Sequence, residues 1–426
     1  MVVWSNGGFN GLTMRQIGVI FFILLYFVII LIDGYIFLDV RTYCTKHKRA
    51  WIIIHGIFLV ISLVLLTVIA CWPIRSGGKD ILPVMWMIYA FLTILIPKIS
   101  YVVCSVVGRL FKISRNGRKI NYGVSIGVVI AVIIFILMWW GALFTRNRIN
   151  VEEVTVSSPR VPKAFNGYRI VQLSDLHVGT WGNDTRFISK LVNRVNSMNP
   201  DLIVFTGDVV NRETSEMEPF LSIFSKLKAK DGVYSVLGNH DYGDYMDWEF
   251  SSQRDSNNML MSVWQNQIGW KLMNNRRDFI THGGDSIVIL GVENWGEPPF
   301  RQYGKLTEAY PLSRDSVYNL NDSRFKILLS HNPEHWNREV TNISNIDLTL
   351  SGHTHAMQMV FNIFGYEWSP SEWKYPQWKG LYERKNPNGE MTRVYVNIGA
   401  GEVGIPSRFG SAYPEITEIT LRHSKE

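Results

Sequence analysis

Hydrophobic positions follow two different patterns on either side of about residue 150. Before that point the chain holds four long, almost entirely apolar runs, at residues 17–38, 51–72, 81–107 and 124–144. Runs of about twenty apolar residues are long enough to cross the hydrocarbon of a bilayer as helices. The first run is too long for a cleavable signal peptide and has no small-residue cleavage site. The pattern therefore predicts a transmembrane region over residues 1–149 with four helices.

Charged residues interrupt two of these runs. Asp33 lies near one end of the first run, and Lys98 follows Pro97 in the third. Charged groups inside a span are costly unless they face a cavity, a partner or the interface. For Lys98, snorkelling of its long side chain to the interface is the favoured interpretation.

Loop charges predict the orientation of the spans. The connections at 41–49 and 108–122 hold nine Lys or Arg residues, whereas the opposite side holds five, namely Arg15, Arg75, Lys79, Arg146 and Arg148. Cytoplasmic loops carry the excess of positive residues. We therefore expect a multi-pass protein of an inner or cytoplasmic membrane, with its N-terminus and its C-terminal domain on the extracytoplasmic side.

After residue 150, short β-branched or aliphatic runs alternate with helical stretches. The strand-like runs cover 168–173, 202–205, 233–237, 326–329 and 346–350, and the helical stretches cover 184–198, 216–228 and 333–338. This alternation predicts an α/β domain over residues 163–426, long enough for one core. Residues 150–162, which contain Pro159 and Pro162, are the expected linker.

Net charge and cysteines differ between the two parts. Residues 1–150 contain 15 Lys or Arg against 3 acidic residues, whereas the rest contains 28 against 33. A domain without a net basic field is poorly suited to bind long nucleic acid, so we expect no nucleic-acid partner. Cys44, Cys71 and Cys104 all precede residue 150, which suits an extracytoplasmic domain that needs no disulfide.

Each strand-like run of the second part is followed by a turn with Asp, Asn or His residues, the residue types that commonly build metal sites. These residues are Asp175, His177, Asp208, Asn211, Asn239, His240, Asp241, His331, His353 and His355. A lone histidine is most often an ordinary packed residue, but five of the eight histidines beyond residue 150 fall in these turns. Oxygen and nitrogen donors without thiolate suit Mn, Fe or Zn. A carboxylate can bridge two ions roughly 3.5–4 Å apart that clamp a phosphate for in-line attack, and Asp208 is the expected bridge.

The ordered turns resemble the signature of the calcineurin-like metallophosphoesterases over about residues 160–422. The resemblance implies two facing mixed sheets flanked by helices. It implies a first divalent transition-metal ion held by Asp175, His177, Asp208 and His355, and a second held by Asp208, Asn239, His331 and His353. His240 matches the residue that contacts the phosphate and protonates the leaving group, with Asp241 orienting it. A neighbouring carboxylate would keep His240 protonated near neutral pH, as a general acid requires.

The glycine-rich stretch 397–404, followed by Arg408 and Pro414–Glu415, restricts the resemblance to one branch of the family. It is similar to the closing segment of a membrane-associated branch that includes UDP-2,3-diacylglucosamine pyrophosphatase-like enzymes. Gly399, Gly401 and Arg408 are then expected to bind substrate, since an arginine fork suits phosphate; a tight turn is the alternative for the glycines. The chain departs from the pattern at Ala356–Met357, where the branch has two glycines, and at Asn211, where Asp is commoner.

An aromatic segment at 365–378 contains Trp368, Trp373 and Trp378. It could form a lip that rests at the bilayer interface, where such rings are favoured, or it could pack beneath a long loop. Residues 244–258, with Trp248, form a second expected rim.

The leading functional hypothesis is a membrane-anchored, two-metal phosphoester or pyrophosphate hydrolase, with manganese among the expected ions. A lipid-linked phosphate is the expected substrate and partner, because anchoring helps most when the substrate is also confined to the bilayer. The first alternative is a UDP-2,3-diacylglucosamine pyrophosphatase-like enzyme on the cytoplasmic side, which conflicts with the loop charges. The second is a non-catalytic membrane scaffold, which a degenerate motif set would favour; no expected ligand is missing.

Overall fold

A computed structural model of the chain describes residues 14–44, 46–73, 75, 81–111, 113–115, 118–298, 300–310 and 322–425. The chain forms two compact units. Residues 4–74 and 83–143 form the membrane unit, and residues 144–426 form most of the C-terminal unit.

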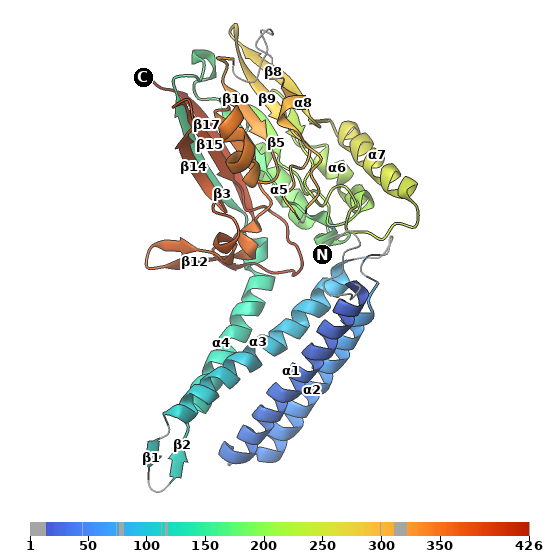
Figure 1. Cartoon of the computed structure of the whole chain (residues 1–426), viewed down its shortest axis with the longest axis vertical. Coiled ribbons are helices and arrows are strands. Elements are labelled where there is room, and N and C mark those ends of the chain that lie inside the picture. The colour runs from blue at the N-terminus through green and yellow to red at the C-terminus, as the bar shows by residue number, and fades with distance from the viewer. Residues whose placement is uncertain are drawn as a thin grey trace. The chain divides into compact units, whose positions relative to one another are not determined.

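Four helices, joined in part by a short hairpin, make up the membrane unit (Figure 1). They are α1 (Met14–Tyr43), α2 (Lys48–Cys71), α3 (Leu82–Leu110) and α4 (Tyr122–Leu143), with β1 (Ile113–Arg115) and β2 (Arg118–Ile120) between α3 and α4. All four are long and apolar enough to cross a membrane, which confirms the expected spans. The helices extend past several ends of the apolar runs, because polar residues continue the helix where the run stops.

Buried carboxylates of α1 pair with polar groups of the other helices. Asp33 accepts a hydrogen bond from Lys98 Nζ at 2.8 Å and lies 3.2 Å from His55 Nε2. The Lys98 side chain is only 12% exposed. The snorkelling interpretation was therefore wrong, because a buried carboxylate on a neighbouring helix offers the ammonium a partner at its own depth. Asp39 likewise accepts from Arg109.

Two six-stranded mixed sheets form the centre of the C-terminal unit (Figure 1). The first has the order β3 (Asn150–Ser158), β17 (Glu415–His423), β4 (Arg169–Leu173), β5 (Leu202–Phe205), β6 (Val233–Ser235) and β7 (Trp270–Leu272). The second has the order β14 (Gly380–Lys385), β15 (Met391–Val396), β11 (Leu348–Ser351), β10 (Lys326–Leu329), β9 (Asp285–Gly291) and β8 (Arg276–His282). A smaller sheet has the order β13 (Tyr366–Trp368), β12 (Met359–Ile363) and β16 (Phe409–Gly410).

The main core lies where the inward faces of the two large sheets meet. Ile170 and Val204 of the first sheet share one buried cluster with Ile289 and Leu350 of the second. Separate clusters cover the outer faces, beneath the helices α5 (Arg186–Ser197), α6 (Leu221–Phe224), α7 (Ser251–Gln267), α8 (Leu306–Ala309) and α9 (Thr341–Ile343). The expected architecture of two facing mixed sheets with flanking helices is confirmed. The stretch expected to be helical at 216–228 contains only the end of a 3-10 helix, Thr214–Phe220, with Pro219 inside it, and the short helix α6.

The expected linker at 150–162 is instead built into the first sheet. Strand β3 pairs in parallel with β17 over all nine residues, from Asn150 opposite Glu415 to Ser158 opposite His423. Its sequence alternates and is rich in β-branched residues, which favours a strand, and Pro159 follows where the pairing ends. Since α4 ends at Leu143, only a 3-10 turn at Thr145–Asn147 separates the last span from this sheet.

Candidate active site

Turns after five strands bring the predicted metal-binding residues to one place. Strands β4, β5 and β6 of the first sheet precede Asp175 and His177, Asp208, and Asn239 respectively. Strands β10 and β11 of the second sheet precede His331, and His353 with His355. Neighbouring parallel strands end at the same edge of a sheet, so their following turns meet. The site therefore lies where the two sheets present their strand ends.

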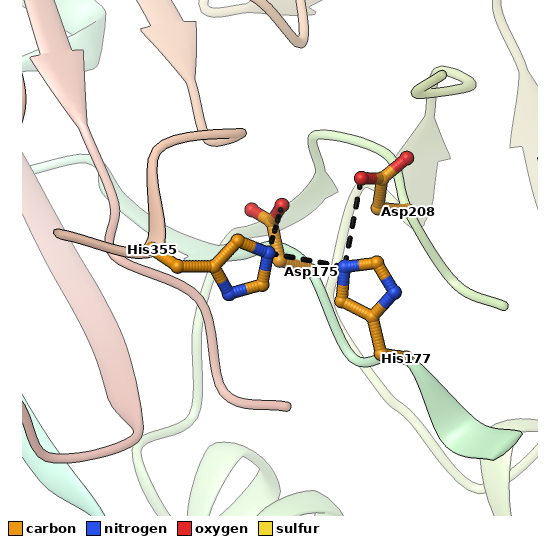
Figure 2. Close-up of side chains that lie close together, drawn as sticks. All are labelled: Asp175, His177, Asp208 and His355. Atoms are coloured by element: carbon orange, nitrogen blue, oxygen red, sulfur yellow. Dashed lines mark hydrogen bonds and ion pairs between the residues drawn. The ribbon is translucent and has the colours of Figure 1, made fainter. Parts of the chain in front are cut away.

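One group of donors contains Asp175, His177, Asp208 and His355, all of them buried (Figure 2). The Nε2 atoms of His177 and His355 lie 3.0 Å apart. His355 Nε2 is 3.2 Å from Asp175 Oδ1, and His177 Nε2 is 3.5 Å from Asp208 Oδ2. Two imidazole nitrogens and two carboxylates facing one point form a donor set suited to a transition-metal ion.

A second group contains Asp208, His331 and His353. His331 Nε2 lies 3.2 Å from Asp208 Oδ2 and 3.2 Å from His353 Nδ1. The Oδ2 atom of Asp208 thus lies between His177 and His331, the position required of a bridging carboxylate. The buried Oδ1 of Asn239 has no hydrogen-bond partner among the described residues, while its amide nitrogen donates to Tyr245 at 2.7 Å. An orphaned buried oxygen of this kind fits a cation, so the residues present fit metal ions.

Backbone conformation at the site is strained. Asp175, His177, Asp208, His353 and His355 all have positive φ, between 42° and 73°. Side chains other than glycine rarely adopt this left-handed region, and such strain gathers where function requires a particular geometry. The turns therefore hold these side chains in directions that an ordinary loop would not give.

Charges within the cluster compensate one another. Burial alone would raise the pKa of Asp208, but the surrounding His331, His240 and His177 hold it well below its usual value. Burial opposes the protonation of His331, yet Asp208 and Asp175 outweigh it and raise the pKa of His331 to about 9. The two carboxylates thus favour positive charge at the centre of the cluster, and a bound cation would supply it.

His240 is oriented by a backbone carbonyl and not by Asp241, contrary to our expectation. The Nδ1 atom of His240 lies 2.6 Å from the carbonyl oxygen of Asn211. The Asp241 carboxylate points beneath the loop, where it accepts hydrogen bonds from the backbone N–H groups of Gly238, Asp208, Val209 and Val210 at 2.8–3.2 Å. Asp241 therefore holds the turn that carries Asp208. Burial also lowers the pKa of His240, although Asp208 opposes this shift.

The residues expected to bind substrate in the C-terminal stretch lie beneath the site. Arg408 is fully buried, and its guanidinium donates to backbone carbonyls of Ile398, Gly399, Gly401, Ala412 and Tyr413. Arg408 is therefore not placed to bind phosphate, contrary to our expectation, because its guanidinium group already donates hydrogen bonds to the backbone. A Cβ atom at Gly399 would lie 2.6 Å from Asp175 Cβ, and one at Gly401 would lie 1.8 Å from Leu176 O. The glycines therefore permit close packing behind the Asp175 turn.

Both departures from the family pattern keep the local geometry. Asn211 lies outside the donor groups; its side chain joins Thr180 N at 3.0 Å and the Glu402 carbonyl at 3.3 Å. Ala356 and Met357, which replace two glycines, have φ of 49° and 46°. They keep the left-handed backbone that glycine adopts easily, at some conformational cost. The half-exposed Met357 side chain then lines the mouth of the site.

A pocket of about 360 Å³ opens over the donors. Besides Asp208, Asn239, His240, His353 and His355, its lining includes Phe300, Met357, Lys374, Tyr375 and Ile405. Tyr375 Oη lies 3.0 Å from His353 Nε2, on the opposite side of that ring from His331. Sequence reasoning marked the aromatic segment and the rim at 244–258 but did not single out Lys374, Tyr375 or Tyr245. Polar aromatic residues close to ligand turns were the available signal.

The three tryptophans of the aromatic segment have different surroundings. Trp378 is buried and belongs to a core cluster with Tyr375 and Val360. Trp373 is 80% exposed, and Trp368 packs edge-on against it with ring centres 5.6 Å apart. Packing therefore accounts for Trp378, whereas the Trp373 side chain is available for a contact at the surface. In the second expected rim, Trp248 is half-buried and donates to the Gly243 carbonyl at 2.7 Å.

Comparison with known proteins agrees with this geometry. Residues 168–357 match the family model for calcineurin-like phosphoesterases, and residues 14–146 match a model described as a probable calcineurin-like phosphoesterase transmembrane domain. The uncharacterized metallophosphoesterase YkuE of Bacillus subtilis is 30% identical over 278 residues, which are 65% of this chain and 86% of that protein. The chain belongs to the calcineurin-like phosphoesterase family. It is therefore a metallophosphoesterase, a hydrolase of phosphoesters, with a transmembrane region.

Two further relatives of this metallophosphoesterase are informative. A transmembrane protein with a metallophosphoesterase domain from Danio rerio is 28% identical over 327 residues, covering 74% of this chain and 68% of that protein. The UDP-2,3-diacylglucosamine pyrophosphatase LpxG of Chlamydia muridarum is 27% identical over 267 residues, covering 55% of this chain and 78% of that protein.

Proposed function

We propose that this metallophosphoesterase binds two divalent transition-metal ions and hydrolyses a phosphoester or pyrophosphate bond in a lipid-linked substrate. The observation that carries the proposal is the position of Asp208 between two groups of buried histidine and carboxylate donors. Asp175, His177 and His355 would complete the first metal site. Asn239, His331 and His353 would complete the second. Two adjacent ions would supply an activated water and neutralise the charge of the phosphate.

Residues around the donors would bind and orient the phosphate. The Nδ1 of His240 is held by the Asn211 carbonyl, so its Nε2 is the nitrogen available to a phosphate or a leaving oxygen in the pocket. The ammonium group of Lys374 lies 5.0 Å from the ring centres of Phe300 and Tyr375 at the pocket wall. A cation there would favour an anionic substrate entering the pocket.

The attachment of the enzyme to the membrane supports a lipid-linked substrate. Strand β3 starts seven residues after α4 ends at Leu143, so the catalytic unit begins where the last span stops. Seven residues reach at most about 25 Å even when fully extended, which keeps the unit near the bilayer surface. An enzyme held there meets lipid headgroups at high local concentration. The relationship to LpxG, whose name specifies a lipid-linked pyrophosphate, adds support.

Metal content and activity of purified full-length protein test the proposal. We expect about two transition-metal ions per chain and hydrolysis of both bis(p-nitrophenyl) phosphate and a bilayer-presented lipid phosphate such as phosphatidic acid or a polyprenyl diphosphate. Asp208→Ala should lower metal content sharply and abolish hydrolysis, since it removes a donor common to both sites. Asp285→Ala, at an exposed position of β9, is the matched control. A folded wild-type protein that stays metal-free after loading with Mn, Fe or Zn would contradict the proposal.

The second candidate is a UDP-2,3-diacylglucosamine pyrophosphatase-like activity on the cytoplasmic side, which the relationship to LpxG favours. It differs from the first in the side of the membrane and in the nucleotide of the substrate. Release of UMP from a UDP-linked diacylglucosamine, at a rate well above that for lipid phosphates without a nucleotide, would favour this candidate.

A further inference from the structure

The hairpin formed by β12 and β13 exposes apolar side chains to an unusual degree. Phe361, Ile363 and Tyr366 are each more than a third exposed, and Phe364 at the tip is fully exposed. Trp373, 80% exposed, extends the same surface, since it packs against Trp368, which in turn stacks on Phe361 with ring centres 6.3 Å apart. A gathered apolar surface of this kind marks a contact with a partner or a membrane.

The tip of the hairpin is strained as well as exposed. Phe364 and Gly365 connect the two strands with φ of 53° and 91°. Two-residue turns with positive φ at both positions strongly favour Asn, Asp or Gly, and a bulky aromatic side chain is costly there. Neither packing among the described residues nor turn geometry therefore explains a phenylalanine at residue 364. A contact made outside the C-terminal unit would explain it.

The hairpin base lies close to the point where the chain leaves the last span. Strand β12 pairs with β16, so that Met359 faces Phe409 and Val360 faces Gly410. Tyr413 follows Gly410 by three residues, which span at most about 11 Å. Its hydroxyl accepts a hydrogen bond from Arg148 at 3.2 Å, five residues after the end of α4. The hairpin and the membrane exit therefore belong to the same end of the C-terminal unit.

Charge in the hairpin is almost fully compensated. Between Met359 and Trp368 the only residue charged at neutral pH is Glu367, and its carboxylate pairs with Lys379 Nζ at 2.8 Å. Tyr366 donates its hydroxyl hydrogen to Glu372 at 2.6 Å. Aromatic rings with polar edges and little net charge are favoured at the interface between lipid and water.

We propose that the β12–β13 hairpin and Trp373 form a wedge that inserts into the bilayer already spanned by the four helices. The wedge is continuous with the active site, because Lys374 and Tyr375 follow Trp373 directly and both line the pocket over the metal-binding residues. Insertion would hold the mouth of the pocket against the lipid headgroups. That second step, delivery of a lipid phosphate to the pocket, rests on the proposed function, whereas insertion itself does not.

Fluorescence quenching of the full-length protein in liposomes tests insertion. Replacing Cys44, Cys71 and Cys104 by Ser and adding Phe364→Cys places a single NBD label at the tip. Asn388→Cys, in the polar exposed turn of the hairpin formed by β14 and β15, places the label of the matched control. We expect quenchers on lipid acyl chains to reach the label at 364 and aqueous iodide to reach the label at 388. Equal accessibility of both labels to iodide would overturn the proposal.

Activity measurements test delivery and separate it from the chemistry. Phe364→Asn suits the turn and should keep the fold; combined with Trp373→Ser, we expect it to lower turnover of phosphatidic acid or a polyprenyl diphosphate in vesicles at least tenfold. Hydrolysis of soluble bis(p-nitrophenyl) phosphate should stay within twofold of the wild type. Met259→Ser, which removes an exposed apolar side chain from α7, should leave both activities unchanged.

Equal loss on both substrates, or a comparable vesicle-specific loss in Met259→Ser, would overturn the delivery role of the wedge. Absence of any hydrolysis by the wild-type protein would instead reject the proposed function, and the quenching pattern would still decide whether the hairpin inserts.

Discussion

Individual side chains outside the signature decide how the metal-binding residues are held. Tyr375 is the clearest example, because its hydroxyl lies 3.0 Å from the Nε2 of His353, whose Nδ1 faces His331. Partners of this kind fix the orientation of a ligating imidazole, and their loss commonly costs about 10- to 100-fold in metal affinity or activity. The amide of Asn239 is held in a comparable way by Tyr245.

On the proposed two-metal site, we therefore expect Tyr375→Phe to weaken binding of the ion held by His353 by about 10- to 100-fold while leaving the other ion unaffected. Metal titration followed by calorimetry measures both affinities. Tyr366→Phe, in the same segment but with its hydroxyl on Glu372, is the control and should bind both ions normally. Equal affinities in the wild type and Tyr375→Phe would mean that packing alone orients His353.

Replacement of His240 tests the acid role that the family resemblance implies. His240→Ala should keep metal binding and lower turnover by roughly 100- to 10,000-fold, the usual range for general acid catalysis. The loss should shrink for p-nitrophenyl esters, whose leaving group needs no proton, and remain large for alkyl esters. Equal losses on both esters would make His240 a phosphate-binding residue and not the acid.

Residue types and their order were sufficient to predict which side chains gather at the site. The turns that follow neighbouring parallel strands lie at the same edge of the sheet, so their side chains meet there. The direction of a side chain was not predictable in the same way. Asp241 was expected to orient His240 and Arg408 to bind phosphate, yet both bind backbone groups beneath the turns. Their roles depend on which side of a loop faces the core, and that is set by residues distant in sequence.

Among the elements, β17 carries a buried acid that makes stability depend on pH. Burial raises the pKa of Glu415 to about 7, and Glu152 on β3 adds to this, whereas hydrogen bonds from Thr417 and Tyr395 and the charge of Lys379 oppose it. The folded state therefore binds a proton more tightly than the unfolded chain. Protonated Glu415 contributes its full stabilisation at pH values below the pKa of this residue in the unfolded chain. The stabilisation is lost as pH rises through about 7.

Glu415→Gln should remove that loss, because the amide remains neutral at every pH. We expect the variant to gain stability over the wild type as pH rises from 5 to 8, by on the order of 3 kcal/mol at most. Thermal unfolding of the full-length protein across this pH range measures the difference. A constant difference in melting temperature from pH 5 to pH 8 would show that Glu415 does not titrate in the folded state.

Helices and strands were predicted correctly where the sequence holds a long apolar run or a recurring short β-branched run. The four spans and the strands before the ligand turns were predicted because long apolar runs and short β-branched runs are distinct local signals. Strand β3 was not, because Pro159 and Pro162, just beyond its end, suggested a linker, and because its partner β17 lies more than 250 residues away. The β12–β13 hairpin was likewise hidden, since its apolar tip resembles core sequence until its exposure is known.

At the scale of the whole molecule, both the first and the last strand of the catalytic unit fix how the unit continues from the membrane region. Its first strand, β3, follows the last span almost directly. Its last strand, β17, pairs with β3 in the same sheet. Arg146, three residues after α4, forms a buried ion pair with Glu402 at 2.9 Å, and the Glu402 carbonyl accepts from Thr180 at 2.7 Å. The membrane exit is thus joined to the loops that surround the metal-binding turns.

The loop charges predict that the catalytic unit works outside the cytoplasm. Asn388→Cys, in a protein whose Cys71 and Cys104 are replaced by Ser, should react with a membrane-impermeant maleimide in intact cells. Cys44 lies between α1 and α2, on the opposite side in a four-span arrangement, and should react only after permeabilisation. The reverse pattern would place the catalytic unit in the cytoplasm, where a nucleotide-linked lipid would become the better substrate. Because both thiols report from one protein, incomplete labelling cannot be mistaken for a reversed topology.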